Sequence, residues 1–195
     1  FHDLCQQMIA SGIKPDFISI DGAEGGTGAA PLEFSDSIGT PLKEGLIKAN
    51  NILRGYNLRK DLKIIASGKI LTGFDVIKAI ALGADACYSA RGMMLALGCI
   101  QALLCNRNNC PTGIATQDHA ISNGLDVEDK GRRIKNYQKQ TLQSVREILA
   151  ASGYDHPSKV DRAHLYRRVS AIDVKNYEEI YPQREVGIDL DKVAA

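Results

Sequence analysis

Three cysteines within a short stretch are the residues of this sequence best suited to chemistry. Cys99, Cys105 and Cys110 are spaced C-x5-C-x4-C, and Pro111-Thr112-Gly113 follows the last of them. Thiolate sulfur is the usual protein ligand of iron–sulfur clusters and of structural zinc. On one straight helix Cys99 and Cys105 would lie about 240° apart, so they can share a ligand only if a helix ends between them. The polar run Asn106–Asn109 is where we expect that end; the alternative is three buried structural thiols.

The segments before the cysteines must position them, and they alternate between strand-like and helical patterns. We expect strands at Phe17–Ile20, Lys63–Ala66 and Asp85–Ser89, and helices at His2–Gly12, 40–54 and Phe74–Leu82. Thr40 is the expected N-cap of the second helix, with Pro41 in its first turn. Strand, glycine-bearing loop and helix in repetition are typical of parallel βα units. The sequence therefore predicts an α/β fold.

Glycine-bearing loops follow each of the three expected strands. They are Asp21–Gly28, Ser67-Gly68-Lys69 and Ala90-Arg91-Gly92. Glycine lets backbone N–H groups approach an anion closely, and phosphate often binds at strand ends beside a helix N-terminus. We expect a phosphate site around Gly68 and Arg91-Gly92, although a glycine-rich loop is also consistent with a flexible turn.

After these loops comes a segment that resembles a known family. GCIQALLCNRNNCPTGIATQ, which ends at Gln117, resembles the cluster segment of glutamate synthases. The likeness continues upstream through IDGAEGGTGAAPLEFSDSIGTP and IIASGKILTGFDV, and more loosely to about Tyr181. Within the family, these segments most resemble those of stand-alone FMN-binding glutamate-synthase-like proteins. One departure is Lys69-Ile70-Leu71-Thr72-Gly73, where the family carries Gln-Leu-Lys-Thr-Gly, so the family's lysine falls on Leu71.

The resemblance implies an FMN- and iron–sulfur-dependent oxidoreductase that forms glutamate reductively from 2-oxoglutarate and an ammonia donor. It implies that Cys99, Cys105 and Cys110 hold a 3Fe-4S cluster. Together with the strand-end positions, it implies that FMN is bound by eight residues: Gly25, Gly26, Ser67, Gly68, Lys69, Ala90, Arg91 and Gly92. No residue stands out as the proton-transfer catalyst; Asp21 and Glu24 lie at the expected strand ends, where a polar loop is the simpler interpretation.

The family fold implies that the chain is the last three βα units of a (β/α)8 TIM barrel followed by a helical extension. We expect residues 1–117 to form the barrel portion with the cysteine segment, and residues 118–195 to form the extension and a polar tail. A long helix should begin near Asp126 and end at Gly153, a short one should cover Lys159–Val169, and the tail should start at Tyr177. A barrel of this kind needs eight strands. We therefore expect that the chain is part of a longer protein, is inactive alone, binds FMN weakly, and forms a homo-oligomer.

The composition of the chain argues against some classes of function. The chain has 195 residues, 44% hydrophobic and 24% charged, with a formal net charge of +1. This balance argues against nucleic-acid binding, and no apolar run reaches membrane-spanning length. Five cysteines and no signal-peptide pattern favour a reducing, cytoplasmic location. The partners we expect are 2-oxoglutarate or glutamate and an electron-donor protein or reductase. Two alternatives stay open: a phosphate-binding barrel enzyme with zinc held by the cysteines and His119, and a non-catalytic cluster-carrying or interaction module.

Overall fold

The centre of the molecule is a parallel sheet of three strands. The computed structural model describes residues 1–25, 30–31, 33–34 and 37–184. The strands β1 (Phe17–Asp21), β2 (Lys63–Ser67) and β3 (Ala86–Tyr88) pair in the order β1-β2-β3. Asp21 lies opposite Ser67, and Ser67 lies opposite Tyr88. All three strands therefore end at the same edge of the sheet, as the sequence predicted.

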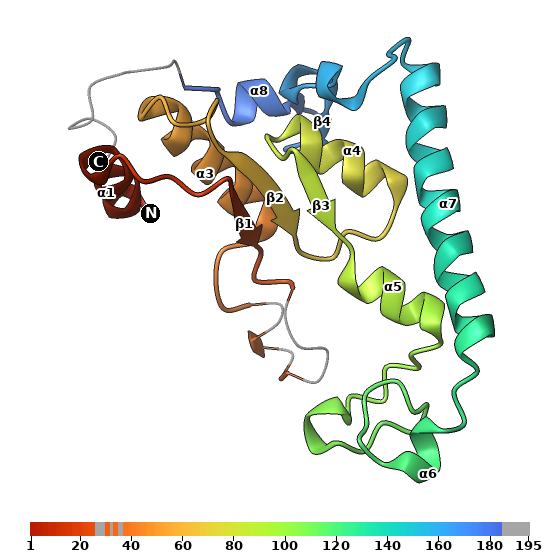
Figure 1. The fold of residues 1–195 in the computed structure, drawn as a ribbon. Helices are drawn as coiled ribbons and strands as arrows, with labels where there is room; N and C mark the ends of the chain where they lie inside the picture. The colour runs from red at the N-terminus through yellow and green to blue at the C-terminus, as the bar shows by residue number, and fades with distance from the viewer. Residues whose placement is uncertain (26–29, 32, 35–36, 185–195) are drawn as a thin grey trace.

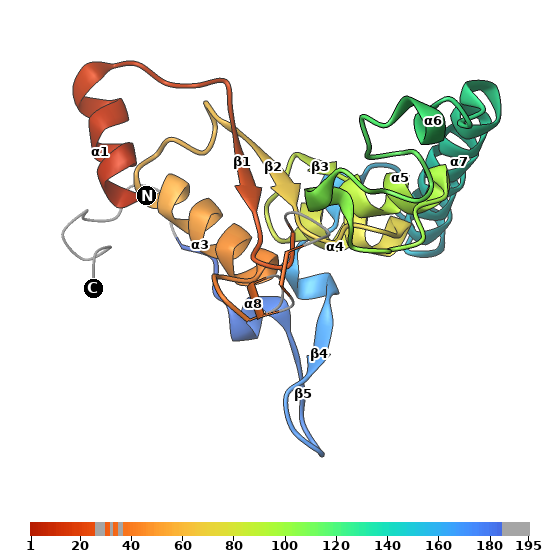
Figure 2. The ribbon, with the colours of Figure 1, turned by 90° about the horizontal axis from the view of Figure 1, so that it is seen from below.

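Helices cover one face of this sheet. The helices that follow the strands are α3 (Leu42–Gly55), α4 (Gly73–Ala81) and α5 (Ala90–Leu97), and α1 (His2–Ser11) precedes them. Figure 2 shows α3 and α4 on the same side of the strands, where Ile64 and Ala66 are completely buried. On the opposite face Phe17 is 52% exposed and Tyr88 49%. The three predicted βα units are thus confirmed, and helices cover one face of the described sheet.

Two of the helix starts show how the loops are held. At α4 the Thr72 hydroxyl accepts from the Asp75 backbone N–H at 3.1 Å, while the Asp75 carboxylate accepts from the Thr72 N–H at 3.0 Å, which is a capping box. The prediction that Thr40 caps α3 is wrong. That helix begins at Leu42, and the Glu24 carboxylate accepts from the Leu42 N–H at 2.8 Å. Glu24, from the loop after β1, thus caps α3. Its carboxylate stabilises the helix because the first-turn N–H groups have no acceptor within the helix.

The cysteine segment begins outside a helix. We expected the helix to continue to Asn106–Asn109, but α5 ends at Leu97, and Gly98 takes the left-handed conformation with φ of 106°. A single 3-10 turn, η1 (Cys105–Arg107), and the short helix α6 (His119–Ser122) are the regular structure of this region. Cys99 and Cys105 therefore lie at the two ends of an irregular loop, Cys105 at the start of η1, and no continuous helix fixes the angle between them.

A long helix packs across the βα units. It is α7 (Val127–Ala151), and its Asp126 N-cap accepts from the Asp129 N–H at 3.0 Å. Figure 1 shows α7 running beside α4 and α5. Its buried residues Val145 and Leu149 belong to the hydrophobic core that also contains Ile64 and Leu53. The amphipathic helix that the sequence predicted is therefore confirmed, and it is joined to the βα units by a common core.

The C-terminal part contains strands as well as helices. The expected helix over Lys159–Val169 is wrong: the structure has η2 (Pro157–Lys159), η3 (Arg162–His164) and β4 (Tyr166–Arg168), and β4 pairs antiparallel with β5 (Val174–Asn176). Figure 2 shows this hairpin extending away from the sheet. Residues 157–180 are thus only partly helical, because residues 166–168 pair with residues 174–176 as strands.

The start of the expected polar tail is also folded. Tyr177 begins the short helix α8 (Tyr177–Ile180) and is only 8% exposed. Arg162 anchors this segment, with its guanidinium donating to the Tyr181 carbonyl at 2.9 Å and to the Asn51 side-chain oxygen at 3.1 Å. Because Arg162 is 2% exposed, these bonds offset the cost of burying its charge.

Within the part of the chain that the structure describes, no helix combines the length and the apolar character needed to cross a lipid bilayer.

Candidate functional site

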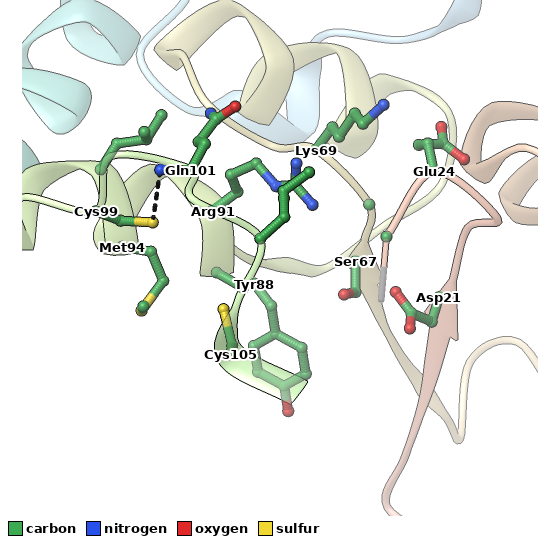
Figure 3. A pocket seen from close by; sticks show the side chains of 15 residues that line it. Asp21, Glu24, Ser67, Lys69, Tyr88, Arg91, Met94, Cys99, Gln101 and Cys105 are labelled. Atoms are coloured by element: carbon green, nitrogen blue, oxygen red, sulfur yellow. Dashed lines mark hydrogen bonds between the residues drawn. The ribbon is translucent and has the colours of Figure 1, made fainter. Parts of the chain in front are cut away.

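A cavity of about 370 Å³ lies at the edge of the sheet where the parallel strands end (Figure 3). The last residue of each strand lines it: Asp21, Ser67 and Tyr88. Ligands of parallel α/β sheets bind at this edge because the loops after the strands converge there. The structure therefore places an open cavity where the sequence predicted a binding site.

Most of the predicted FMN residues surround this cavity. Those that line it are Gly25, Ser67, Gly68, Lys69, Ala90 and Arg91. Gly26 lies outside the described residues. Gly92 lies behind the cavity wall and is described below. Lys69 and Arg91 bring two basic side chains to the same cavity, and an anionic ligand gains from such a pair.

The turn after β2 needs glycine for two reasons. Gly68 has φ of 147°, a backbone conformation that other residues rarely adopt. A Cβ atom there would also lie 3.1 Å from Cβ of Leu42, the first residue of α3. Lys69 follows with φ of 47°. Two consecutive positive φ angles produce a tight turn that leaves backbone at the cavity surface.

The N-terminus of α5 supplies the opposite wall. Ser89 is its N-cap residue, but the Ser89 hydroxyl makes no cap hydrogen bond and instead donates to the Ile70 carbonyl at 2.7 Å. Among the described residues, no side chain accepts from the first-turn N–H groups of α5. Ala90 and Arg91, which open this helix, line the cavity. The positive end of the helix dipole and the Arg91 charge together favour an anion at this wall.

Gly92 has a packing role that the sequence did not reveal. It is buried, and a Cβ atom at this position would overlap the Tyr137 hydroxyl and lie 2.7 Å from Cζ of the same ring. The absent side chain therefore makes room for α7, where Tyr137 lies. Helix packing explains the small size of Gly92, and its predicted contact with phosphate stays a prediction.

The two acidic candidates differ in what they do. Glu24 is occupied as the cap of α3 through its bond to the Leu42 N–H. Asp21 is exposed at the end of β1 and lines the cavity. Glu24 therefore has a structural role in holding its loop against α3, and it also lines the cavity.

The five cysteines fall into two groups. Burial raises the pKa of Cys87 to about 11, and burial also raises the pKa of Cys5, so both stay protonated thiols. Cys99, Cys105 and Cys110 are free thiols as well. Cys99 and Cys105 line the cavity, while Cys110 is 8% exposed and lies outside its lining.

Cys110 has an environment that stabilises a thiolate. The pKa of Cys110 is lowered to about 7, mainly by a hydrogen bond with the Thr112 hydroxyl, whose oxygen lies 3.2 Å from the sulfur. Backbone groups of Ala115, Thr112 and Ile114 lower it further. The sulfur of Cys99 accepts from the Gln101 backbone N–H at 3.4 Å (Figure 3). Hydrogen bonds to sulfur of this kind are found at iron–sulfur ligands.

Cys99, Cys105 and Cys110 do not converge on one point in this structure. Among the described residues, no three His, Cys, Asp or Glu side chains are grouped as they would be around a metal ion. His119, the candidate fourth zinc ligand, is exposed at the start of α6. The donor chemistry suits a cluster, and the described geometry brings two of the three thiols to one cavity.

Several cavity residues could not be found from sequence patterns. Met94, Leu95 and Leu103 provide an apolar wall, and Gln101 completes it. Gln101 and Leu103 both have φ of 56°, an uncommon conformation for residues with side chains. No sequence signal marks such angles. The irregular loop between Cys99 and Cys105 is therefore a tertiary feature of the site.

Most of this sequence matches a known protein family. The family described as "Conserved region in glutamate synthase" matches residues 3–155. This chain belongs to the glutamate synthase family. It is 41% identical over 182 residues to the glutamate synthase large subunit-like protein YerD of Bacillus subtilis, and 44% identical over 138 residues to the archaeal glutamate synthase [NADPH] of Methanocaldococcus jannaschii. A ferredoxin-dependent glutamate synthase 2 of Synechocystis is 35% identical over 151 residues.

The family likeness covers most of this chain but a smaller part of the relatives. The matches take in 93% of the chain for the Bacillus protein, 71% for the Methanocaldococcus protein and 75% for the Synechocystis protein. They span 35%, 27% and 9% of those proteins. The glutamate synthase family match includes all three strands, the cavity and the cysteine segment.

Proposed function

We propose that this chain carries the FMN-phosphate and iron–sulfur portion of a glutamate-synthase-type oxidoreductase. The reaction is the reductive formation of glutamate from 2-oxoglutarate and an ammonia donor, with an electron-donor protein or reductase as partner. One observation supports this most strongly. A single cavity at the strand ends is lined by a glycine turn, two basic side chains, the start of a helix and two of the three cysteines.

The phosphate half of the site rests on the turn after β2 and the start of α5. Gly68 keeps backbone accessible at one wall, and the uncapped first turn of α5 faces the other. Lys69 and Arg91 add positive charge at the same cavity. In this proposal they neutralise the FMN phosphate and orient the cofactor toward the strand ends. FMN, once bound, supplies the hydride and electron transfer chemistry.

The cluster half of the site rests on Cys99, Cys105 and Cys110, proposed as the three thiolate ligands of a 3Fe-4S cluster. Cys110 is prepared for this role by its lowered pKa, because the ligand form of cysteine is the thiolate. Cys87, which is half-buried on β3, is not proposed as a fourth ligand, because burial raises its pKa to about 11 and favours the thiol. Hydrogen bonds to the sulfurs, such as Gln101 N–H to Cys99, would tune the reduction potential of the cluster.

The open sheet face supports a larger assembly. Among the described residues β1 and β3 each pair only with β2, and Phe17 and Tyr88 are exposed on the uncovered face. We propose that residues 1–117 are the last three βα units of a TIM barrel, and that residues 118–195 extend it. In solution the isolated chain would cover this face by forming a homo-oligomer, since unpaired edges and apolar patches associate. The proposed location is the cytoplasm.

The isolated chain should therefore lack glutamate synthase activity and bind FMN weakly. Catalytic residues of barrel enzymes come from several strand ends, and only three are described here. Light scattering and flavin analysis of the purified chain test this. A stable monomer that retains stoichiometric FMN would refute this part of the proposal.

Anaerobic reconstitution with iron and sulfide tests the cluster. We expect about three irons per chain, as a 3Fe-4S cluster requires, with the broad visible absorption of iron–sulfur proteins. Cys105→Ser should lose iron, whereas the matched control Cys87→Ser, which alters a half-buried thiol on β3, should keep it. Four irons per chain, unchanged uptake in Cys105→Ser, or a colourless protein that binds stoichiometric zinc instead would each contradict the proposal.

A further inference from the structure

Tyr137 connects the two turns that form the phosphate half of the site. It lies in the middle of α7, and its hydroxyl donates to the Leu71 carbonyl at 2.5 Å. Its oxygen also lies 3.4 Å from the oxygen of the Ser89 hydroxyl, which donates to the Ile70 carbonyl at 2.7 Å. Because each hydroxyl gives its one hydrogen to a carbonyl, the two hydroxyls touch without a hydrogen bond between them. Three segments that are distant in sequence thus meet at one small network of two hydrogen bonds and one contact.

The network lies behind the cavity wall. Ile70 and Leu71 directly follow Gly68 and Lys69, and Ser89 directly precedes Ala90 and Arg91. The turn after β2 and the start of α5 belong to different βα units, so their relative position is not set by local sequence. The two hydroxyls join them at residues immediately next to those that line the cavity.

The packing around Tyr137 is built for this contact. Gly92 has no side chain where the Tyr137 hydroxyl approaches α5, and a Cβ atom there would overlap that hydroxyl. The Ser89 hydroxyl donates to Ile70 and does not cap α5, so in the described part of the chain no side chain accepts from the first-turn N–H groups. The same network that joins the turns therefore also leaves the helix N-terminus available to a ligand.

We propose that Tyr137 is a positioning residue that holds Gly68-Lys69 and Ala90-Arg91 at the separation needed to bind a phosphate group between them. It does not touch the ligand and acts through the Leu71 carbonyl and the Ser89 hydroxyl. This inference rests on the proposed FMN-phosphate site. It also gives the C-terminal helix α7 a part in cofactor binding, because donors bind an anion well only when they are held in place beforehand.

The test compares FMN with riboflavin, which has the same ring system and no phosphate. Amide NMR shifts of Gly68 and Arg91 in the 195-residue chain would give the affinity for each flavin. The variant is Tyr137→Phe. The matched control is Tyr181→Phe. The Tyr181 hydroxyl donates to the Glu44 carboxylate at 3.1 Å, and neither residue lines the cavity. Ser89→Ala is the second variant, since it breaks the network without altering α7.

We expect wild type to bind FMN more tightly than riboflavin. Tyr137→Phe and Ser89→Ala should bind FMN about three- to tenfold more weakly than wild type, which is the effect of losing one hydrogen bond. Riboflavin affinity should stay within about twofold, and Tyr181→Phe should behave as wild type. An unchanged FMN preference in Tyr137→Phe and Ser89→Ala, or equal losses in Tyr181→Phe, would overturn the role of Tyr137 alone. A wild-type chain that binds both flavins equally would instead overturn the proposed phosphate site, and this inference with it.

Discussion

Replacing Gly92 by alanine tests the packing between α5 and α7. A Cβ atom at residue 92 would overlap the Tyr137 hydroxyl and lie 2.7 Å from Cζ and 2.8 Å from the Ser89 hydroxyl. Overpacking of this kind costs about 1–3 kcal/mol, and loss of the Tyr137 hydrogen bond to Leu71 costs about 1 kcal/mol. Alanine in a helix offsets this by about 0.5–1 kcal/mol. We therefore expect Gly92→Ala to lower the free energy of unfolding by about 1–3 kcal/mol.

Gly131 provides the matched control. It also lies within a helix, α7, but a Cβ atom there would meet nothing within 4 Å. Gly131→Ala should raise the free energy of unfolding by about 0.5–1 kcal/mol, because only the backbone entropy of the unfolded chain changes. Urea denaturation of both variants at one protein concentration measures the contrast, since an oligomer would make stability depend on concentration.

A double variant locates the cause of the Gly92→Ala effect. In a Tyr137→Phe background the hydroxyl overlap is absent, and the contacts with Cζ of residue 137 and with the Ser89 hydroxyl remain. Gly92→Ala should then cost less than it does in the wild-type background, and the difference measures the coupling. If Gly92→Ala proves as stable as Gly131→Ala, or if its cost is the same in both backgrounds, the proposed close contact between these residues is refuted.

Three further outcomes are expected. Arg162→Met should lower the free energy of unfolding by about 2 kcal/mol in urea, because two partly buried hydrogen-bond acceptors lose a charged donor; a similar loss in the exposed control Arg167→Met would contradict this. Thr112→Val should raise the pKa of Cys110 above about 7, as read from the Cys110 Cβ NMR shift. Because that pKa is depressed from 9.0, the thiolate stabilises the fold above pH 9.0 and this contribution disappears as the pH falls to about 7. The stability advantage of wild type over Thr112→Val should therefore shrink by about 1–2 kcal/mol over that range, and a constant difference would disprove the assignment. Thr72→Ala should lower the free energy of unfolding by about 1 kcal/mol through loss of the α4 capping box, and an unchanged melting temperature would argue against it.

The strands and most helices could be predicted because their signals are local. Phe17–Asp21 and Lys63–Ser67 match the expected apolar runs to within one residue, and Gly12 ends α1 in the left-handed conformation as expected. The position of the cavity followed from these predictions, since parallel strands must end at one edge. The cysteine spacing and the glycine loops marked the chemically useful residues for the same reason: each pattern lies within a dozen residues.

Predictions failed where a distant residue decides the local structure. Thr40 is a suitable cap by sequence, but Glu24 caps α3 from another loop. The region 159–169 has helical composition, yet Arg162 is held by Asn51, and the hairpin residues pair with one another. Side-chain contacts across such separations have no local signature, because any of many residues could have supplied them.

The sequence by itself determined which residues can do chemistry: the three closely spaced cysteines, the strand-end glycines and the basic residues beside them. Only the tertiary structure decided how these residues are supported. In the sequence, nothing links Tyr137, which lies within the predicted long helix, to the site, and Gly92 is predicted to contact phosphate and not α7. Their contact joins two βα units behind the cavity, and it exists only because α7 packs across both. Local periodicity specifies that α7 is a helix, whereas the fit of side chains at the interface determines what that helix holds in place.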